Sequence, residues 1–199
     1  MIVIKFILSA LLGYGLGCIS TGLILSGKAS VDIRSMGSKS TGATNMTRVM
    51  GLRHGLLTFI GDFLKAALAV WLGYLIAGRD GSLISGLFVI IGHNWPFLYG
   101  FKGGKGIVCS SAVLLFVTPM EGLVSGIIAL LVIYLTRYVS LGSLSLLFVA
   151  AVMLPFTRGI WPYGAWGILL FLLAAYQHRA NIKRLINGTE SKFTGKKDT

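Results

Sequence analysis

Residues 2–25 read IVIKFILSALLGYGLGCISTGLIL, an apolar run in which Lys5 is the sole charged side chain. A helix of about 20 apolar residues spans the hydrocarbon core of a bilayer, and a helix that stops short or is broken needs fewer. Seven segments have this character, over 2–25, 55–77, 83–99, 106–118, 121–136, 139–155 and 160–177. The sequence therefore predicts an all-α integral membrane protein with seven transmembrane helices, some short or broken, in a single domain over 1–199.

The composition excludes an ordinary soluble enzyme. The chain is 55% apolar and 12% charged, and that charged share is about half of the share in a typical soluble domain. So few charged side chains cannot cover a globule of this size with a polar surface. A formal net charge of +12 would point to nucleic acid in a soluble protein, but in an apolar chain it indicates anionic lipid or phosphorylated substrates. We expect the lipid bilayer, and no nucleic acid, as a partner.

The basic residues orient the predicted helices, because short cytoplasmic loops carry an excess of Lys and Arg. The alternating topology places most of them on one side: Lys28, Arg34, Lys39, Arg48, Arg53, Lys102, Lys105, Arg137, Arg179, Lys183, Arg184, Lys192, Lys196 and Lys197. This predicts an N-terminus outside and a cytoplasmic C-terminus. Three polar segments, 34–54, 92–106 and 177–192, then share the cytoplasmic face, where we expect them to form one site.

The first polar segment contains GSKSTGATNMTR at 37–48. Small residues allow a tight turn that brings backbone amides close to an anion, and hydroxyl, amide and guanidinium side chains add further donors. The stretch is a candidate phosphate-binding loop. Its composition is equally typical of a flexible polar loop, so composition alone leaves both interpretations open.

The second polar segment reads GHNWPFLYGFKGGKG at 92–106. It lacks the spacing of a nucleotide P-loop, and Gly106 stands where Ser or Thr should follow the lysine. The stretch predicts a glycine-hinged turn that presents Lys102 and Lys105 beside aromatic residues. Interfacial anchoring would explain the aromatic residues, but not the three glycines around Lys105.

The third polar segment begins HRANIKRL at 178–185. If the preceding helix continues, His178, Asn181 and Leu185 share one face. A basic flank that fixes topology explains the neighbouring arginines and lysine, but not His178 and Asn181.

Two further features lie within predicted spans. Asp62 and Lys65 are one helical turn apart, where unpaired charges are costly, and a structural ion pair is the favoured interpretation. Ser143 is a hydroxyl that we expect to bond a neighbouring helix. The three histidines lack metal-ligand spacing, so no metal site is predicted.

Taken in order, these motifs resemble the acyl-phosphate-dependent glycerol-3-phosphate acyltransferase family (PlsY). The resemblance implies transfer of a fatty acyl group from acyl phosphate to the sn-1 hydroxyl of glycerol 3-phosphate, without a cofactor. It places the protein in the bacterial inner membrane, with a cytoplasmic active site and a functional link to the enzyme that makes acyl phosphate. The first motif departs from the family pattern at Lys39-Ser40-Thr41.

The resemblance also implies roles for individual residues. It implies catalytic roles for Ser38, Arg48, Lys105, His178 and Asn181. It implies substrate-binding roles for Thr44, Asn45, Lys102, Gly103, Gly104 and Ser143.

The mechanism we expect is substrate-assisted. His178 is the obvious side-chain base, but the positive charges of Arg179, Lys183 and Arg184 disfavour the positive charge that its ring gains on accepting a proton, which weakens it as a base. A phosphate oxygen of the donor would then take the hydroxyl proton. One alternative is an acyltransferase on the same scaffold with a different donor or acceptor. A small anion carrier is disfavoured, because the outer side lacks a matching polar segment.

Overall fold

The computed structural model describes residues 1–193, which fold into helices without any β-strand. Lys196 and Lys197, expected to hold the tail inside, lie outside the described residues. The described residues divide into two compact units, 1–113 and 114–193. Each unit is described by itself.

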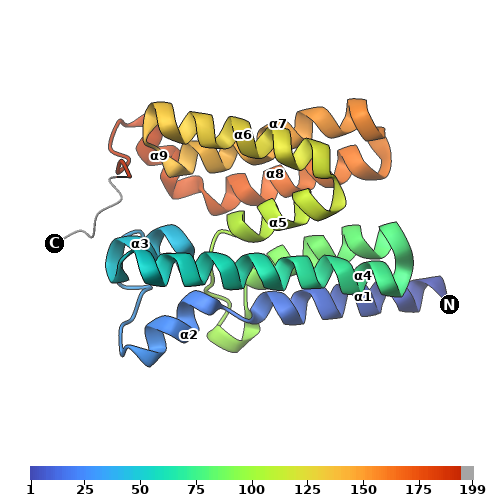
Figure 1. The fold of residues 1–199 in the computed structure, drawn as a ribbon, viewed down its shortest axis with the longest axis horizontal. Coiled ribbons are helices and arrows are strands. Elements are labelled where there is room, and N and C mark those ends of the chain that lie inside the picture. Colours follow the sequence, from blue (N-terminus) through green and yellow to red (C-terminus); the bar gives the residue numbers. More distant parts are fainter. Residues whose placement is uncertain (194–199) are drawn as a thin grey trace. The chain divides into compact units, whose positions relative to one another are not determined.

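The first unit is built around the long helix α4 (Figure 1). Its elements in chain order are α1 (Ile2–Cys18), α2 (Thr21–Lys28), α3 (Ala43–Met50), α4 (Leu52–Asn94) and the short 3₁₀ helix η1 (Phe97–Tyr99). Helix α5 (Ile107–Val117) follows and contains the boundary between the units.

Helix α4 is a hairpin. A straight helix of its 43 residues would be about 64 Å long, roughly twice the thickness of a bilayer core. The backbone instead leaves helical geometry at Ala77 and Gly78, where the φ of Gly78 is +60°, and the ribbon doubles back there (Figure 1). A Cβ atom added at Gly73 would meet the carbonyl oxygen of Gly81, and the reverse also holds. The two predicted spans 55–77 and 83–99 are therefore the two arms of one hairpin.

Small residues let α1 pack closely on the second arm of α4. A Cβ atom at Gly13 would meet the backbone of Ser85, and one at Gly17 would meet the backbone carbonyl of Val89. A Cβ atom at Gly92 would likewise meet the carbonyl of Tyr14. Close backbone approach through small residues is typical of helix packing in membranes.

The second unit is a bundle in which α7 packs against both α6 and α8. Its elements are α6 (Pro119–Thr136), α7 (Val139–Arg158), the π-helical turn η2 (Ile160–Gly164), α8 (Ala165–Gln177) and α9 (Arg179–Ile186). Arg158 donates two hydrogen bonds, of 2.8 and 3.2 Å, to the carboxylate of Glu121. This ion pair joins the start of α6 to the end of α7.

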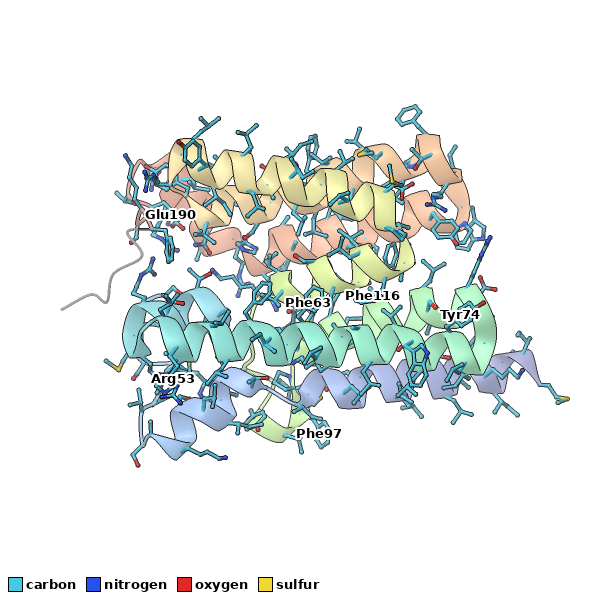
Figure 2. All side chains as sticks on the ribbon, in the orientation of Figure 1. Arg53, Phe63, Tyr74, Phe97, Phe116 and Glu190 are labelled. Carbon is cyan, nitrogen blue, oxygen red and sulfur yellow. The ribbon has the colours of Figure 1, made fainter. Side chains whose placement is uncertain are left out.

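Many large apolar side chains point outward from the helices (Figure 2). Leu64, Tyr74, Leu130 and Tyr134 are all more than half exposed, whereas buried positions are often small or polar. Within residues 1–193, five helices are long and apolar enough to cross a membrane: Ile2–Lys28, Leu52–Tyr99, Pro119–Thr136, Val139–Arg158 and Ile160–Gln177. Helix α5 is apolar but shorter. An apolar exterior of this kind is expected of a protein surrounded by lipid.

The first polar segment is not the continuous loop that its composition suggested. Its second half forms α3, which begins after Gly42 with a hydrogen bond from Met46 N to the Gly42 carbonyl. Burial of Asn45, Met46 and Thr47 stabilises this short helix, and the absence of a side chain at Gly55 lets Thr47 pack directly on α4. Tertiary packing thus overrides the low helix propensity of the small polar residues.

Candidate active site

Asn45 organises the loop that precedes α3. Its Oδ1 accepts a hydrogen bond of 2.8 Å from the backbone amide of Ser38. Its Nδ2 donates to the carbonyl oxygens of Ile33, Met36 and Ser40, at 3.2, 3.1 and 2.9 Å. The side chain is buried and commits both polar groups to the loop, so it fixes the position of Ser38.

The other first-motif residues occupy different parts of this structure. Ser38 lies in the loop, whereas Thr44 and Arg48 lie on α3. All three are half-buried. Gly37 has a φ of +55°, and a Cβ atom there would meet Oδ1 of Asn45. The turn before Ser38 therefore requires glycine both for its backbone conformation and for space.

The second motif folds back onto the C-terminal end of α4. The amide of Gly103 donates to the Asn94 carbonyl at 3.2 Å, and the amide of Gly104 donates to the His93 carbonyl at 3.1 Å. A Cβ atom at Gly104 would meet Nε2 of His93. Lys105 directly follows and is half-buried, whereas Lys102 is exposed. The glycines around Lys105 therefore allow close backbone contact with α4.

A buried charged cluster lies behind this turn. Nζ of Lys65 is 3.1 Å from Oδ1 of Asp62, and 3.0 Å from Nδ1 of His93. Lys65 also donates to the carbonyls of Gly17 and Ile19, at 3.0 and 2.6 Å. The expected ion pair between Asp62 and Lys65 is confirmed, and His93 joins it.

Asn94 is also buried beside the turn. Neither polar atom of its side-chain amide forms a hydrogen bond within the described part of the chain. Its Oδ1 lies against Gly106, where an added Cβ atom would be 2.7 Å away. An unpaired buried polar group costs about 1–3 kcal/mol.

In the second unit, His178 caps the end of α8. Its Nδ1 is 2.8 Å from the Ala174 carbonyl oxygen, which can only accept, so Nδ1 carries a proton. In the neutral ring Nε2 is then the nitrogen that accepts. The helix is interrupted at His178, which has φ −98° and ψ 8°, and α9 follows directly. His178 and Asn181 are both buried.

Glu190, which is labelled in Figure 2, ties the third motif together. Its Oε1 accepts hydrogen bonds from Ser140 at 2.7 Å and Asn181 at 2.6 Å, and its Oε2 accepts from Arg184 at 2.6 Å. Burial raises the pKa of this carboxyl, but the three hydrogen bonds and the charge of Arg184 outweigh burial, so its pKa lies below the ordinary value. The carboxylate thereby joins α7 to α9.

Ser143 lies on α7 and is buried. Its hydroxyl donates to the Val139 carbonyl of its own helix at 2.8 Å, rather than to a neighbouring helix as expected. A serine hydroxyl that back-bonds in this way keeps its oxygen as an acceptor.

The candidate residues thus form two sets, each within its own unit. The first unit holds Ser38, Thr44, Asn45, Arg48, Lys102, Gly103, Gly104 and Lys105, and the second holds Ser143, His178 and Asn181. Sequence reasoning missed the structural roles of His93 and Glu190. The signals were present in the sequence. His93 lies in the same polar segment as Gly103 and Gly104, and Glu190 belongs to the Gly-Thr-Glu that closes the third motif.

The chain matches the family model described as glycerol-3-phosphate acyltransferase over residues 7–188. It is 40% identical to a glycerol-3-phosphate acyltransferase of Thermoanaerobacter pseudethanolicus, covering 94% of this chain and 95% of that protein. It is 45% identical to the Finegoldia magna protein of the same name, and this match covers 90% of this chain and 92% of that protein. With the Clostridioides difficile protein of that name the identity is 40% over the full length of both chains.

Two solved structures are similar to the whole fold. One is the glycerol 3-phosphate form of PlsY, an integral membrane glycerol 3-phosphate acyltransferase, with a TM-score of 0.89 and 34% identity over 94% of this chain and 95% of that one. The other is the lysophosphatidic acid form of PlsY, with a TM-score of 0.86 and 33% identity over 96% of each chain.

Proposed function

The chain belongs to the glycerol-3-phosphate acyltransferase family, and from that membership we propose that it transfers a fatty acyl group from acyl phosphate to the sn-1 hydroxyl of glycerol 3-phosphate. The products are lysophosphatidic acid and inorganic phosphate. The observation that carries the proposal is the family match over residues 7–188, which contains the first two polar segments and the third as far as Gly188. The solved relatives with glycerol 3-phosphate and lysophosphatidic acid support the acceptor and the product.

The chemistry of the first unit suits two phosphorylated reactants. Each phosphate needs positive charge and hydrogen-bond donors, which the side chains of Arg48 and Lys105 supply. Ser38 adds a hydroxyl on a loop held rigid by Asn45. We assign Asn45 to positioning of this loop, because its amide groups already bond the backbone.

The reaction itself needs little from the protein besides orientation and charge. The sn-1 oxygen attacks the acyl carbonyl carbon, a new carbon–oxygen bond forms, and the bond from that carbon to the phosphate oxygen breaks. The departing phosphate takes the electron pair of that bond and also the hydroxyl proton. His178 and Asn181 position or polarise the acceptor, and holding two reactants together supplies most of the rate enhancement.

The placement in the membrane is part of the same proposal. If the two arms of α4 and the short helix α5 each count as one span, the five long helices become seven spans. We infer an outside N-terminus, a cytoplasmic C-terminus and a cytoplasmic active site in the bacterial inner membrane. The enzyme that makes acyl phosphate would be a functional partner.

The test is a direct assay of detergent-purified protein. Palmitoyl phosphate and glycerol 3-phosphate are supplied and lysophosphatidic acid is measured, with palmitoyl-CoA as the comparison donor. We expect product from palmitoyl phosphate alone. Product from palmitoyl-CoA but not from palmitoyl phosphate would overturn the donor assignment and favour a different acyltransferase on the same scaffold.

Two substitutions test the phosphate-binding residues in this assay. Arg48→Ala and Lys105→Ala should each lower kcat/KM by an amount equivalent to about 2–4 kcal/mol, as expected for a lost contact to a charged oxygen. Arg53→Ala, a change at an exposed arginine on the first turn of α4, is the matched control. An unchanged kcat/KM in Arg48→Ala or Lys105→Ala would remove that residue from the site.

A further inference from the structure

The cluster of Asp62, Lys65 and His93 is not used by the proposed chemistry. Their side chains are 1%, 7% and 3% exposed, and all three lie in helix α4. Removing a charge pair from water costs several kcal/mol per ion. The cluster therefore needs a physical account of its own.

The three protons of the Lys65 ammonium all have acceptors. They point to the carbonyls of Gly17 and Ile19 and to Nδ1 of His93. Asp62 Oδ1 lies 3.1 Å from the same nitrogen but makes no hydrogen bond among the described residues. Asp62 thus acts as the counter-charge, while the directed bonds go to the break between α1 and α2 and to His93.

Lys65 also fixes the state of the His93 ring. An ammonium has no acceptor, so Nδ1 must accept and the neutral ring carries its proton on Nε2. That edge faces Gly104, where an added Cβ atom would meet Nε2. The backbone carbonyl of His93 accepts a hydrogen bond of 3.1 Å from the Gly104 amide. His93 therefore both tethers the turn and sets how closely it approaches α4.

We propose that Asp62, Lys65 and His93 are positioning residues that set the Gly103–Gly104–Lys105 turn for phosphate binding. The inference rests on the proposed function, which gives Lys105 a phosphate to bind. Lys65 holds the ring, the ring and its carbonyl hold Gly104, and Gly104 holds the backbone next to Lys105. A displacement of about 1 Å at such a residue can lower the rate about a hundredfold.

The rival account is that the cluster only joins α1 to α4. Lys65 would then serve by capping the carbonyls of Gly17 and Ile19, and the contact of His93 with Gly104 would be incidental. The two accounts differ in one measurable respect. A cluster that only joins α1 to α4, which we call a structural lock, changes the amount of folded protein when it is lost. A positioning network instead changes the affinity of the folded protein for substrate.

The experiment is a double-mutant cycle on the contact between ring and turn. His93→Asn keeps an acceptor close to the place of Nδ1 for Lys65 and removes the ring edge that faces Gly104. Gly104→Ala adds a methyl group that meets the ring. The double variant places that methyl group in the space the ring has left. His54→Asn, a histidine of the same helix whose Nδ1 contacts the Met50 carbonyl, is the matched control.

Two quantities are measured for each full-length variant in detergent. One is the KM for glycerol 3-phosphate in the acyltransferase assay. The other is the rise in thermal midpoint on adding glycerol 3-phosphate, which reports binding without any acyl donor. We expect each single variant to raise KM about tenfold, equivalent to about 1.4 kcal/mol. The double variant should raise KM by less than the product of the two single-variant fold increases. His54→Asn should match the unmodified protein in both measured quantities.

Two results would overturn the inference. One is a KM and a ligand-induced rise that stay unchanged while the midpoint without ligand falls, as a structural lock predicts. The other is single effects that multiply in the double variant, because independent sites add in free energy. Failure of the proposed function can be told apart from failure of the inference. If glycerol 3-phosphate stabilises the unmodified protein but acyl phosphate gives no product, the donor assignment fails, and the mutant cycle is still evaluated from the ligand-induced rise in thermal midpoint. If glycerol 3-phosphate does not raise the midpoint of the unmodified protein, the inference fails as well.

Discussion

At the scale of single residues, Glu190 shows how one carboxylate can hold a motif in place. It accepts from Ser140, Asn181 and Arg184, so it links the candidate catalytic Asn181 to α7. Neither Ser140 nor Arg184 needs to touch substrate for its loss to affect the reaction. The orientation of Asn181 depends on a residue nine positions later.

Glu190→Gln should lower the thermal midpoint at neutral pH, because the new amide group would face the Arg184 guanidinium, and donor would meet donor. The pKa of Glu190 lies below its ordinary value, so its stabilising effect is present above the unfolded pKa of about 4.3 and is lost as the pH falls through the folded pKa. Midpoints measured from pH 7 to pH 3.5 should therefore differ less between the two proteins at the acidic end than at neutral pH. Thr189→Ala is the control. A constant difference across this range would contradict the prediction.

His178 provides the second prediction at this scale. Because the proton goes to the departing phosphate in the proposed mechanism, His178→Gln and His178→Ala should keep the neutral limb of the pH–rate profile, with a rate loss below about four decades. Profiles of kcat/KM for both variants provide the measurement. Loss of four or more decades together with that limb would make His178 the general base.

Sequence reasoning identified residue types at this scale better than it identified their contacts. Asn45 was expected at the substrate, yet its amide is bonded to four backbone groups of the preceding loop. From the sequence alone, Asn45 could either bind substrate or hold the loop, because an amide group donates to a phosphate oxygen and to a backbone carbonyl in the same way. The distinction depends on where the loop folds, which local pattern does not encode.

At the scale of elements, the hairpin of α4 depends on the close approach of its two arms at Gly73 and Gly81. Gly73→Ala should destabilise the protein by about 1–3 kcal/mol, because the methyl group would meet the Gly81 carbonyl and the Ser85 side chain in an already packed contact. Thermal unfolding monitored by circular dichroism gives the measurement. Gly15→Ala in α1 is the control, since an added Cβ atom there meets nothing within 4 Å. Equal midpoints for the two variants would show that the arms can separate without cost.

Apolar segments predicted the long helices well, and the reason is physical. Burial in lipid requires long unbroken runs, so 121–136, 139–155 and 160–177 appear in the structure with ends shifted by a few residues. Helix α3 was missed because its stability comes from packing on Gly55 of α4 rather than from its own residues. The break at His178 was also not visible, because apolar periodicity continues into α9.

At the scale of the whole molecule, the asymmetry of basic residues predicts orientation in the membrane. A green fluorescent protein fused after the last residue should fluoresce, because the C-terminus is predicted to be cytoplasmic. Alkaline phosphatase inserted at Arg79, beside the α4 reversal, should be active because that turn is predicted to be outside. The same phosphatase inserted at Arg53 should be inactive. Activity at Arg53 together with a dark C-terminal fusion would reverse the assigned orientation.

The contact between His93 and Gly104 also bears on how related chains can diverge. A side chain at position 104 and an imidazole at position 93 compete for the same space, so neither position can change freely while the other is kept. A lineage that replaced His93 by a smaller residue would be released from the demand for glycine at 104, and the buried charges at 62 and 65 would lose one of their partners. We expect these four positions to vary together among natural homologues, and substitutions there to be accepted in sets rather than singly.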